Sequence, residues 1–466
     1  MKRRIVNLFH MAMSFFRSLF VVPALPGPLG VFVKTMKQNL TAEDIDTHIE
    51  GCIGCGVCAA ACPLYMATQD PQHHPKRRSD ELRKIYRMFF TFVGRLKTIL
   101  KMAKFPAGED LKKLSDLVFG VHGCCTMCGR CTLACSQGVR NNRLVELTRA
   151  ALTAAGIVPP VVQEILTNSR TTGHSFGKTW DETVGKAVQM AREAGVKVTV
   201  DRKGAKYLLP CSSIGNTLHP EVLTFAGEVL NVAGVDFTVS SRLKNTGTEE
   251  ATFCVDMPLA LSYAEEMCAE AARLGCKYII VGECACDVRW LSVEAAEVFT
   301  KHGVELVYID ALLLDRANQG KLPLKNLGEV VTLHDPCWTV RKAGYGDVVR
   351  GLLQKCATLI EMTPNREHTY CCGAGGGGIR MWPDSTDPEN IRMNVSAFKA
   401  EQIRQTGVSA VVTPCATCWR SLDQIVEHHN VPAKTDMLMM LVYRAMMAAL
   451  SRKAVQEPEP AVALAA

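Results

Sequence analysis

The chain has 466 residues, of which 48% are hydrophobic and 21% charged, with a net charge of +7 and 21 cysteines. At about 150 residues per domain, this length suggests about three domains with sizeable cores, so the chain needs no disulfide staples. The cysteines cluster tightly, which favours metal ligation in a reducing compartment over disulfides and argues against a generic hydrolase or a purely structural protein.

Residues 1–41 form a basic, apolar N-terminal arm with six basic side chains and no acidic one. Its apolar stretch, residues 5–22, contains Arg17 and is followed by three prolines, so it falls short of the ~18 apolar residues of a transmembrane helix. Three interpretations stay open. The stretch is a helix lying on a membrane or against a membrane subunit, an ordinary docked helix or loose terminus, or a twin-arginine export signal.

Residues 42–155 are predicted to form an α-rich, two-cluster ferredoxin-like domain with a helical insertion over residues 70–118. Residues 52–63 have the pattern C-x2-C-x2-C-x3-C-P, and residues 125–135 repeat it without the proline. In two-cluster ferredoxins three cysteines of such a run bind one cluster and the fourth binds the other. The predicted ligands of the two cubane [4Fe–4S] clusters are Cys52, Cys55, Cys58 and Cys135 for one, and Cys125, Cys128, Cys131 and Cys62 for the other.

The insertion between these motifs carries apolar residues at helical spacing, at Leu82, Ile85, Phe89, Phe92 and Leu96. It is also basic, with twelve Lys and Arg against four acids between residues 73 and 113. We therefore expect a basic helix with a solvated charged face over a packed apolar stripe. The basic residues lie in two local patches, whereas a nucleic-acid-binding protein more often spreads them with interleaved aromatics over one face, so no nucleic-acid partner is expected.

The second half contains an internal repeat of about 120 residues. After a linker with helices over residues 156–205, two α/β domains are predicted at residues 206–328 and 329–450, and residues 451–466 are predicted to be a disordered tail. Each block has a Pro-Cys pair, a helix that ends at a glycine, a β-branched strand and a cysteine directly after that strand. Parallel α/β sheets place reactive groups outside the carboxyl ends of their strands.

The second block carries Cys337 in a His-Asp-Pro-Cys motif, the pair Cys371-Cys372 before a glycine-rich run, and a Cys415-Ala-Thr-Cys418 motif. These motifs resemble the cysteine-rich CCG domain of the B and D subunits of heterodisulfide reductase, of the K subunit of the sulfite-reduction-associated membrane complex (DsrK), and of the glycolate oxidase iron–sulfur subunit. A two-cluster ferredoxin followed by two CCG copies is similar to the arrangement in the D and K subunits. The resemblance implies one noncubane [4Fe–4S] cluster held by Cys337, Cys371, Cys372, Cys415 and Cys418.

The first block departs from this pattern. Cys254 has no cysteine beside it, and Asp287 stands where the sequence alignment would place Cys418. The block therefore holds an incomplete set, made up of Cys211, Cys254, Cys284 and Cys286. We expect a single noncubane cluster in the chain. The first block is then a structural half retained for an interface, or it holds a modified cluster or another ligand.

The resemblance implies an oxidoreductase subunit of the heterodisulfide reductase type. The cubane clusters would exchange electrons with a quinone pool through a membrane cytochrome b-like subunit. The noncubane cluster would cleave or form the S–S bond of a disulfide or thiol substrate, a small protein being one candidate. Such a chain would lie peripherally at the cytoplasmic face of the inner membrane, and His334 is a candidate catalytic residue beside the ligands.

Two alternative functions stay open. In the first, the chain is an electron relay in a glycolate-oxidase-like flavoprotein complex. In the second, it is a colourless zinc-stabilised scaffold without redox activity. A zinc site of two C-x2-C pairs would leave four cysteines unexplained. No flavin or NAD is expected in this chain, because the glycine run 375–378 lacks G-x-G-x-x-G spacing. Cys268, Cys276 and Cys356 fall outside the motifs and are expected to be buried structural thiols.

Overall fold

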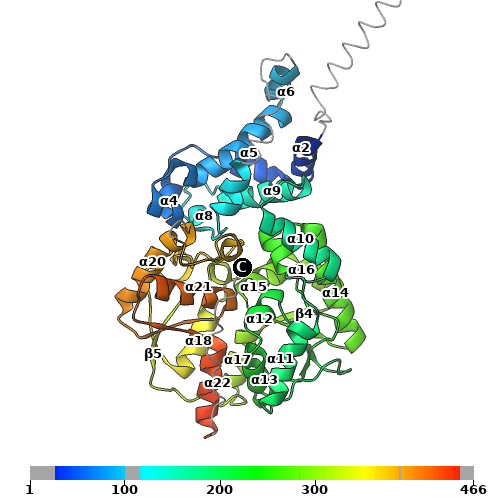
Figure 1. Cartoon of the computed structure of the whole chain (residues 1–466), viewed down its shortest axis with the longest axis vertical. Helices are drawn as coiled ribbons and strands as arrows, with labels where there is room; N and C mark the ends of the chain where they lie inside the picture. Colours follow the sequence, from blue (N-terminus) through cyan, green and yellow to red (C-terminus); the bar gives the residue numbers. More distant parts are fainter. Residues whose placement is uncertain (1–26, 100–115, 283, 388–389, 452–466) are drawn as a thin grey trace, which may run out of the picture. The chain divides into compact units, whose positions relative to one another are not determined.

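The computed structural model describes residues 27–99, 116–282, 284–387 and 390–451. It divides into two compact units, residues 1–159 and 160–466, which are described separately (Figure 1). The predicted membrane-contacting stretch 5–22, residues 100–115 of the insertion and the predicted tail beyond Ser451 lie outside the described residues. Within the described ranges, no helix combines the length and the apolar character needed to cross a bilayer.

The first unit is helical. Its helices are α2 (Gly27–Asn39), α3 (Val57–Ala61), α4 (Pro63–Thr68), α5 (Pro75–Phe90), α6 (Phe92–Ile99), α8 (Arg130–Leu133) and α9 (Asn141–Ala154), with shorter turns η1 (Asp44–Ile49), η2 (Pro71–His73) and η3 (Phe119–Gly123). Both α2 and α5 pack against α9. The buried face of α2 follows helical spacing, at Leu29, Phe32, Val33 and Met36. The described end of the N-terminal arm is therefore a helix docked within this unit.

The inserted helix is only partly as expected. Leu82, Ile85 and Phe89 are buried along α5, which confirms the apolar stripe. The helix is interrupted at Thr91, and Phe92 at the start of α6 is 48% exposed. The prediction of a solvated basic face is wrong at Arg78 and at Arg83, whose side chains are buried because each finds hydrogen-bond acceptors inside the unit.

The second unit contains two four-stranded parallel sheets of the same order. The first sheet has β1 (Tyr207–Leu208), β2 (Phe237–Thr238), β3 (Tyr278–Val281) and β4 (Glu305–Tyr308) in the order β2-β1-β3-β4. The second has β5 (Val330–Leu333), β6 (Thr358–Ile360), β7 (Ala410–Thr413) and β8 (Lys434–Met437) in the order β6-β5-β7-β8. The predicted fold class, an α-rich segment followed by duplicated α/β sheets, is confirmed.

Helices alternate with these strands. They are α10 (Pro160–Thr172), α11 (Lys186–Glu193), α12 (Ser213–Leu218), α13 (Val222–Val232), α14 (Met257–Leu274), α15 (Ala285–Arg289), α16 (Ala296–Lys301), α17 (Ile309–Asn318), α18 (Gly346–Cys356), α19 (Gly378–Met381), α20 (Ile391–Thr406), α21 (Ala416–His428) and α22 (Leu438–Ala449), with turns η4 (Asp181–Gly185), η5 (Glu250–Cys254), η6 (Trp290–Glu294), η7 (Thr339–Ala343) and η8 (Arg366–His368). The helices α14 and α20 end at Gly275 and Gly407, whose φ angles of 75° and 66° lie in the left-handed region. This is the helix, glycine and strand succession that the repeat predicts.

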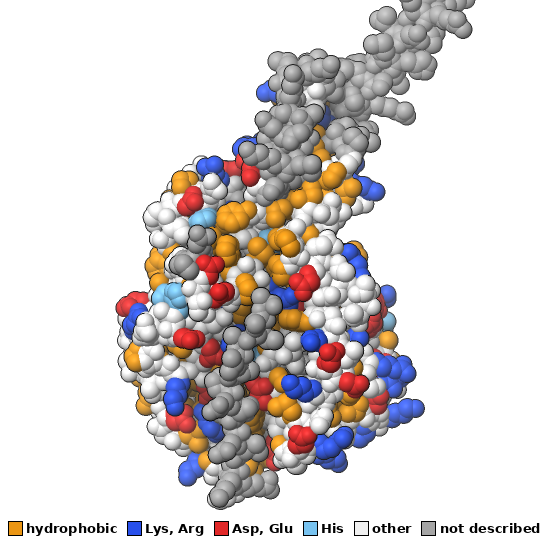
Figure 2. All heavy atoms as spheres, in the orientation of Figure 1, with side chains coloured by type: hydrophobic (Ala, Val, Ile, Leu, Met, Phe, Trp, Pro, Cys, Tyr) orange, Lys and Arg blue, Asp and Glu red, His pale blue; other side chains and the backbone are white. Residues whose placement is uncertain are grey.

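The two copies share one hydrophobic core. The central strands β3 and β7 are short apolar runs, buried after their first residue, as parallel strands covered by helices should be. Helix α13 of the first copy packs against α22 of the second, and α17 of the first packs against α18 of the second. These contacts join the two copies into one compact unit. On the face drawn in Figure 2, acidic and basic side chains of the second unit are interspersed.

Candidate metal centres

The first four-cysteine group mixes residues from both cysteine-rich motifs. Cys52, Cys55 and Cys58 line one hollow of the first unit together with Cys135. Burial raises the pKa of the Cys58 thiol, and the nearby Cys52, Cys135 and Cys55 sulfurs add to that rise. The fourth cysteine of the second motif is thus brought to the first three of the first motif, as the exchange between ferredoxin motifs requires.

The second group has the complementary membership. Burial raises the pKa of Cys131 well above its usual value, and the neighbouring Cys62, Cys128 and Cys125 sulfurs act in the same direction. A soft, fourfold sulfur donor set in each group fits an iron–sulfur cluster. Left-handed φ angles of 74°, 80° and 80° at Gly54, Gly56 and Gly129 let the chain turn tightly between the cysteines.

Two buried arginines beside the second group were not expected from the sequence. The Arg78 side chain donates a hydrogen bond to the Cys62 sulfur over 3.2 Å. Burial would lower the pKa of Arg78, but the Cys62 and Cys125 sulfurs raise it above its usual value. Arg149 of α9 donates to the carbonyl of Cys125 over 2.7 Å. Positive charge placed here offsets the negative charge that thiolates and a cluster bring together.

The second sheet brings together the cysteines of the complete copy. Cys337 follows β5, Cys372 lies in the loop after η8, and Cys415 and Cys418 lie at the start of α21; these four line one cavity beyond the carboxyl ends of the strands. The Cys372 and Cys418 sulfurs are 3.5 Å apart. The Cys418 amide donates to the Cys415 sulfur over 3.4 Å. Cys371 is also buried, and its sulfur accepts a hydrogen bond from the amide of Gly373 over 3.3 Å.

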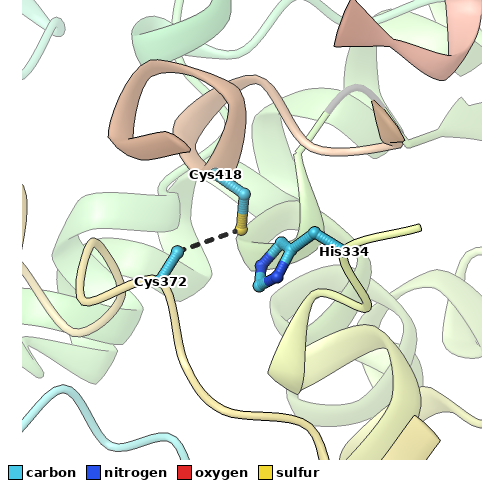
Figure 3. Close-up of side chains that lie close together, drawn as sticks. All are labelled: His334, Cys372 and Cys418. Carbon is cyan, nitrogen blue, oxygen red and sulfur yellow. Dashed lines mark hydrogen bonds between the residues drawn. The ribbon is translucent and has the colours of Figure 1, made fainter. Parts of the chain in front are cut away.

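His334 faces this group (Figure 3). One ring nitrogen and the sulfurs of Cys372 and Cys418 all lie within 4.8 Å of one another. The histidine is 1% exposed, and neither ring nitrogen has a hydrogen-bond partner among the described residues. Its backbone amide donates to the carbonyl of Val412 in β7, so the pairing of the two central strands fixes its position. Burial lowers the pKa of His334 well below its usual value.

Helix α20 buries two cations near the same cysteines. Lys399 is fully buried, and its amino group donates to the Thr369 hydroxyl over 3.1 Å. Burial lowers the pKa of Lys399 to about 8, while negative charge at Asp335 and at Cys372 opposes that shift. Arg392 donates to the Ser421 hydroxyl over 3.0 Å and to the Gln424 side-chain oxygen over 2.6 Å. Neither cation was expected from the sequence, although polar residues recur at helical spacing along the buried face of α20, at Arg392, Ser396 and Lys399.

The first copy has a different cavity at the carboxyl ends of its strands. Cys211 lines it with Asp287 and Asp310, and most other lining residues are apolar. The Asp287 carboxylate accepts hydrogen bonds from the hydroxyls of Thr246, over 2.7 Å, and Thr248. Burial raises the pKa of Asp310 to about 7. The position that aligns with Cys418 is therefore committed to a hydrogen-bonded carboxylate.

The remaining cysteines of the first copy lie in other surroundings. Cys254 is fully buried, and its neighbour Phe253 packs so closely on Gly377 of the second copy that a side chain at the glycine would overlap the ring. At Gly377 the glycine-rich run therefore lies directly against this phenylalanine. Cys284 and Cys286 lie beside Cys415 of the second copy.

Comparison with known proteins supports both the dicluster segment and the complete CCG copy. The family model of the 4Fe-4S dicluster domain matches residues 48–139, and the cysteine-rich CCG domain matches residues 331–423. An Hdr-like menaquinol oxidoreductase iron–sulfur subunit 2 of Archaeoglobus fulgidus is 24% identical over 90% of this chain and 83% of its own length. The D subunit of a dihydromethanophenazine:CoB–CoM heterodisulfide reductase from Methanosarcina mazei is 26% identical over 83% of this chain and 90% of its own length. An EtfAB:quinone oxidoreductase of Syntrophomonas wolfei is 25% identical over 79% of this chain and 54% of its own length.

Proposed function

We propose that this chain, with its dicluster and CCG domains, is the iron–sulfur subunit of a membrane-associated oxidoreductase complex that exchanges electrons with a disulfide or thiol substrate. The observation that carries the proposal is the convergence of Cys337, Cys372, Cys415 and Cys418 on one buried cavity, with Cys371 adjacent. These are the five cysteines that the CCG resemblance assigns to a noncubane cluster.

We assign the three clusters to different domains. Residues 42–155 hold two cubane clusters through the two four-cysteine groups, residues 329–450 hold the noncubane cluster, and residues 206–328 are the incomplete copy. Cubane clusters transfer one electron at a time. Cleavage of a disulfide consumes two electrons and two protons and yields two thiols, and oxidation of two thiols is the reverse. A chain with two one-electron centres and one sulfur-binding centre suits this stoichiometry in either direction.

The residues around the complete copy favour sulfur chemistry. A noncubane cluster held there would supply iron sites with affinity for the sulfurs of a substrate. His334 presents an imidazole nitrogen that has no partner among the described residues toward Cys372 and Cys418, where it can hydrogen-bond to a sulfur. Buried Lys399 and Arg392 provide positive charge that stabilises thiolates in this low-dielectric site. Trp338 forms part of the cavity wall and is 2% exposed.

The partner is proposed from the names of the relatives. Menaquinol, dihydromethanophenazine and quinone all appear in them, which supports a membrane subunit that exchanges electrons with a lipid-soluble carrier. We propose a cytochrome b-like subunit, with this chain bound peripherally at the cytoplasmic face of the inner membrane. Its many closely spaced thiols suit a reducing compartment.

The test is purification of the native complex without loss of its metal. We expect a brown protein with about 12 iron atoms per chain, from three four-iron clusters. We also expect an electron paramagnetic resonance signal that changes when a thiol such as 2-mercaptoethanol is added to the oxidised complex. A full iron content without any thiol-dependent spectral change would overturn the S–S chemistry.

A second candidate is supported by the similarity to the EtfAB:quinone oxidoreductase. In it the chain passes electrons from a flavoprotein to the membrane without acting on a disulfide, as in a glycolate-oxidase-like complex. The proteins that co-purify discriminate the two candidates. A flavin subunit together with thiol-insensitive spectra favours the relay, whereas a cytochrome b-like subunit with thiol-sensitive spectra favours the disulfide enzyme.

A further inference from the structure

The two copies meet at equivalent corners. Cys284 precedes α15 directly after the β3 region, and Cys415 precedes α21 directly after β7. Their sulfurs are 4.0 Å apart. The amide of Ala285 donates to the Cys415 sulfur over 3.3 Å, and the Cys284 sulfur lies 3.3 Å from the Thr417 hydroxyl. The strand-to-helix turn of each copy therefore touches the turn of the other.

This contact pairs equivalent positions of the two copies. Counting along the chain from Cys284 and Cys415, Cys286 occupies the position of Thr417, and Asp287 occupies the position of Cys418. Both Cys286 and Thr417 line the cavity of the complete copy. Thr417 reaches that cavity from its own copy, whereas Cys286 reaches it from the other.

Adjacent residues of α15 face different cavities. Asp287 faces the cavity of its own copy and accepts hydrogen bonds from two threonine hydroxyls there. Cys286 faces the cavity with Cys337, Cys372, Cys415 and Cys418, and it is 8% exposed. The incomplete copy therefore has Asp287 at the position of Cys418, while it contributes Cys286 to the cavity of its neighbour.

We infer that Cys286 supplies a sixth sulfur ligand to the cluster of the complete copy. The inference rests on the proposed function, because it assumes that the five cysteines of that copy hold iron. A thiolate is a soft ligand suited to iron–sulfur centres, and ligation releases the thiol proton. Independently, His334 is buried, has no ring hydrogen-bond partner among the described residues and lies within 4.8 Å of the Cys372 and Cys418 sulfurs, two of the residues that line this cavity, which marks these sulfurs as a ligand site. A resident thiolate on iron also competes with external thiols, so Cys286 tunes how readily a substrate sulfur binds.

The test replaces Cys286 by the residue at the equivalent position of the other copy, Cys286→Thr, in the purified complex. The matched control is Cys276→Ala, a buried thiol of the same copy that lies in the hydrophobic core. We expect Cys286→Thr to retain the cubane signals and to shift the electron paramagnetic resonance spectrum of the noncubane cluster. We also expect the 2-mercaptoethanol concentration for half-maximal spectral change to fall about tenfold, the equivalent of about 1.4 kcal/mol. The control should match the wild type.

Each outcome decides a different claim. A wild-type complex without a noncubane signal overturns the proposed function, and this inference with it. A wild type with that signal and a Cys286→Thr spectrum and thiol titration identical to it overturn the sixth ligand alone. Circular dichroism checks folding. If Cys286→Thr does not fold, Cys286→Ala, which is smaller than cysteine, replaces it, and an unchanged spectrum in that variant overturns the inference equally.

Discussion

The two copies in the second unit have the same sheet order and share one core, yet their cavities are chemically different. In the second copy the cavity is lined by cysteines and faces His334. In the first copy the aligned positions hold Leu208 in place of His334 and Asp287 in place of Cys418. The contrast teaches that the sheet and its helices do not depend on the sulfur ligands. Function resides in a few side chains at the strand ends, and these differ while the scaffold is the same.

The first copy contributes packing contacts to the second. Its helix α13 packs on α22, and its Phe253 packs on Gly377 of the glycine-rich loop that follows Cys371 and Cys372. The aromatic ring stands next to Cys254, where the complete copy has a cysteine pair. A position that holds a proposed ligand in one copy thus holds a packing residue in the other, and that residue packs against the glycine-rich loop of the neighbour.

The largest expected difference between the two copies follows from removing one cysteine from each. Cys372→Ser removes a predicted ligand of the complete copy, and Cys211→Ser removes the cysteine that lines the cavity of the incomplete copy. We expect Cys372→Ser to abolish the noncubane signal and lower the iron content from about 12 toward about 8 atoms per chain. Cys211→Ser should leave both unchanged. Iron analysis and electron paramagnetic resonance measure the two effects, and loss of iron in Cys211→Ser would show that the first copy also binds a cluster.

The second largest difference concerns ion pairs. In the second copy Arg350 and Asp335 form a buried pair with distances of 2.7 and 2.8 Å, and Arg350 also contacts Glu361. Arg350→Met leaves a buried carboxylate without its cation, so we expect a loss of about 3 kcal/mol in the free energy of unfolding.

The matched change in the first copy is Lys277→Met. Its pair with Glu305 at 3.4 Å is exposed on both sides, and water screens the attraction in such pairs so that they add little to stability. Urea unfolding followed by circular dichroism should show a clearly lower midpoint for Arg350→Met and almost no change for Lys277→Met. Equal midpoints for the two variants would contradict the assigned burial.

A third change makes the complete copy resemble the incomplete one. His334→Leu introduces the residue that aligns at position 208 and removes the imidazole that faces Cys372 and Cys418. Loss of the hydrogen bond that we propose this imidazole makes to a sulfur, about 1.4 kcal/mol, should lower thiol–disulfide turnover about tenfold. A shift of the cluster midpoint potential should accompany it, which a purely structural role would not cause. The control is Leu208→Met in the first copy, and an unshifted potential in His334→Leu would contradict the role of the histidine.

Much of this organisation is visible in the sequence, because cysteine spacing and strand patterns are local signals. The C-x2-C-x2-C-x3-C runs point to two four-cysteine groups, and the apolar runs at β3 and β7 mark the central strands. Contacts between distant segments are not visible in this way. Arg78 carries no local sign that its helix turns it toward Cys62, and a lysine at position 399 is typical of a solvated helix face. The position of Cys286 depends on how the two copies pack, which no single motif encodes.

The smallest effect expected is that of Lys399→Met, which keeps the side-chain length and removes the buried charge. The incomplete copy has no proposed cluster whose charge a buried lysine would offset. Lys399 therefore tests a feature that is specific to the complete copy. Positive charge beside a cluster stabilises its reduced, more negative state. We therefore expect a more negative midpoint potential, lower by tens of millivolts, where about 59 mV corresponds to a tenfold change for one electron. Lys434→Met, at an exposed position in β8, is the control. Redox titration followed by electron paramagnetic resonance measures both, and equal potentials would mean that the Lys399 charge does not reach the cluster.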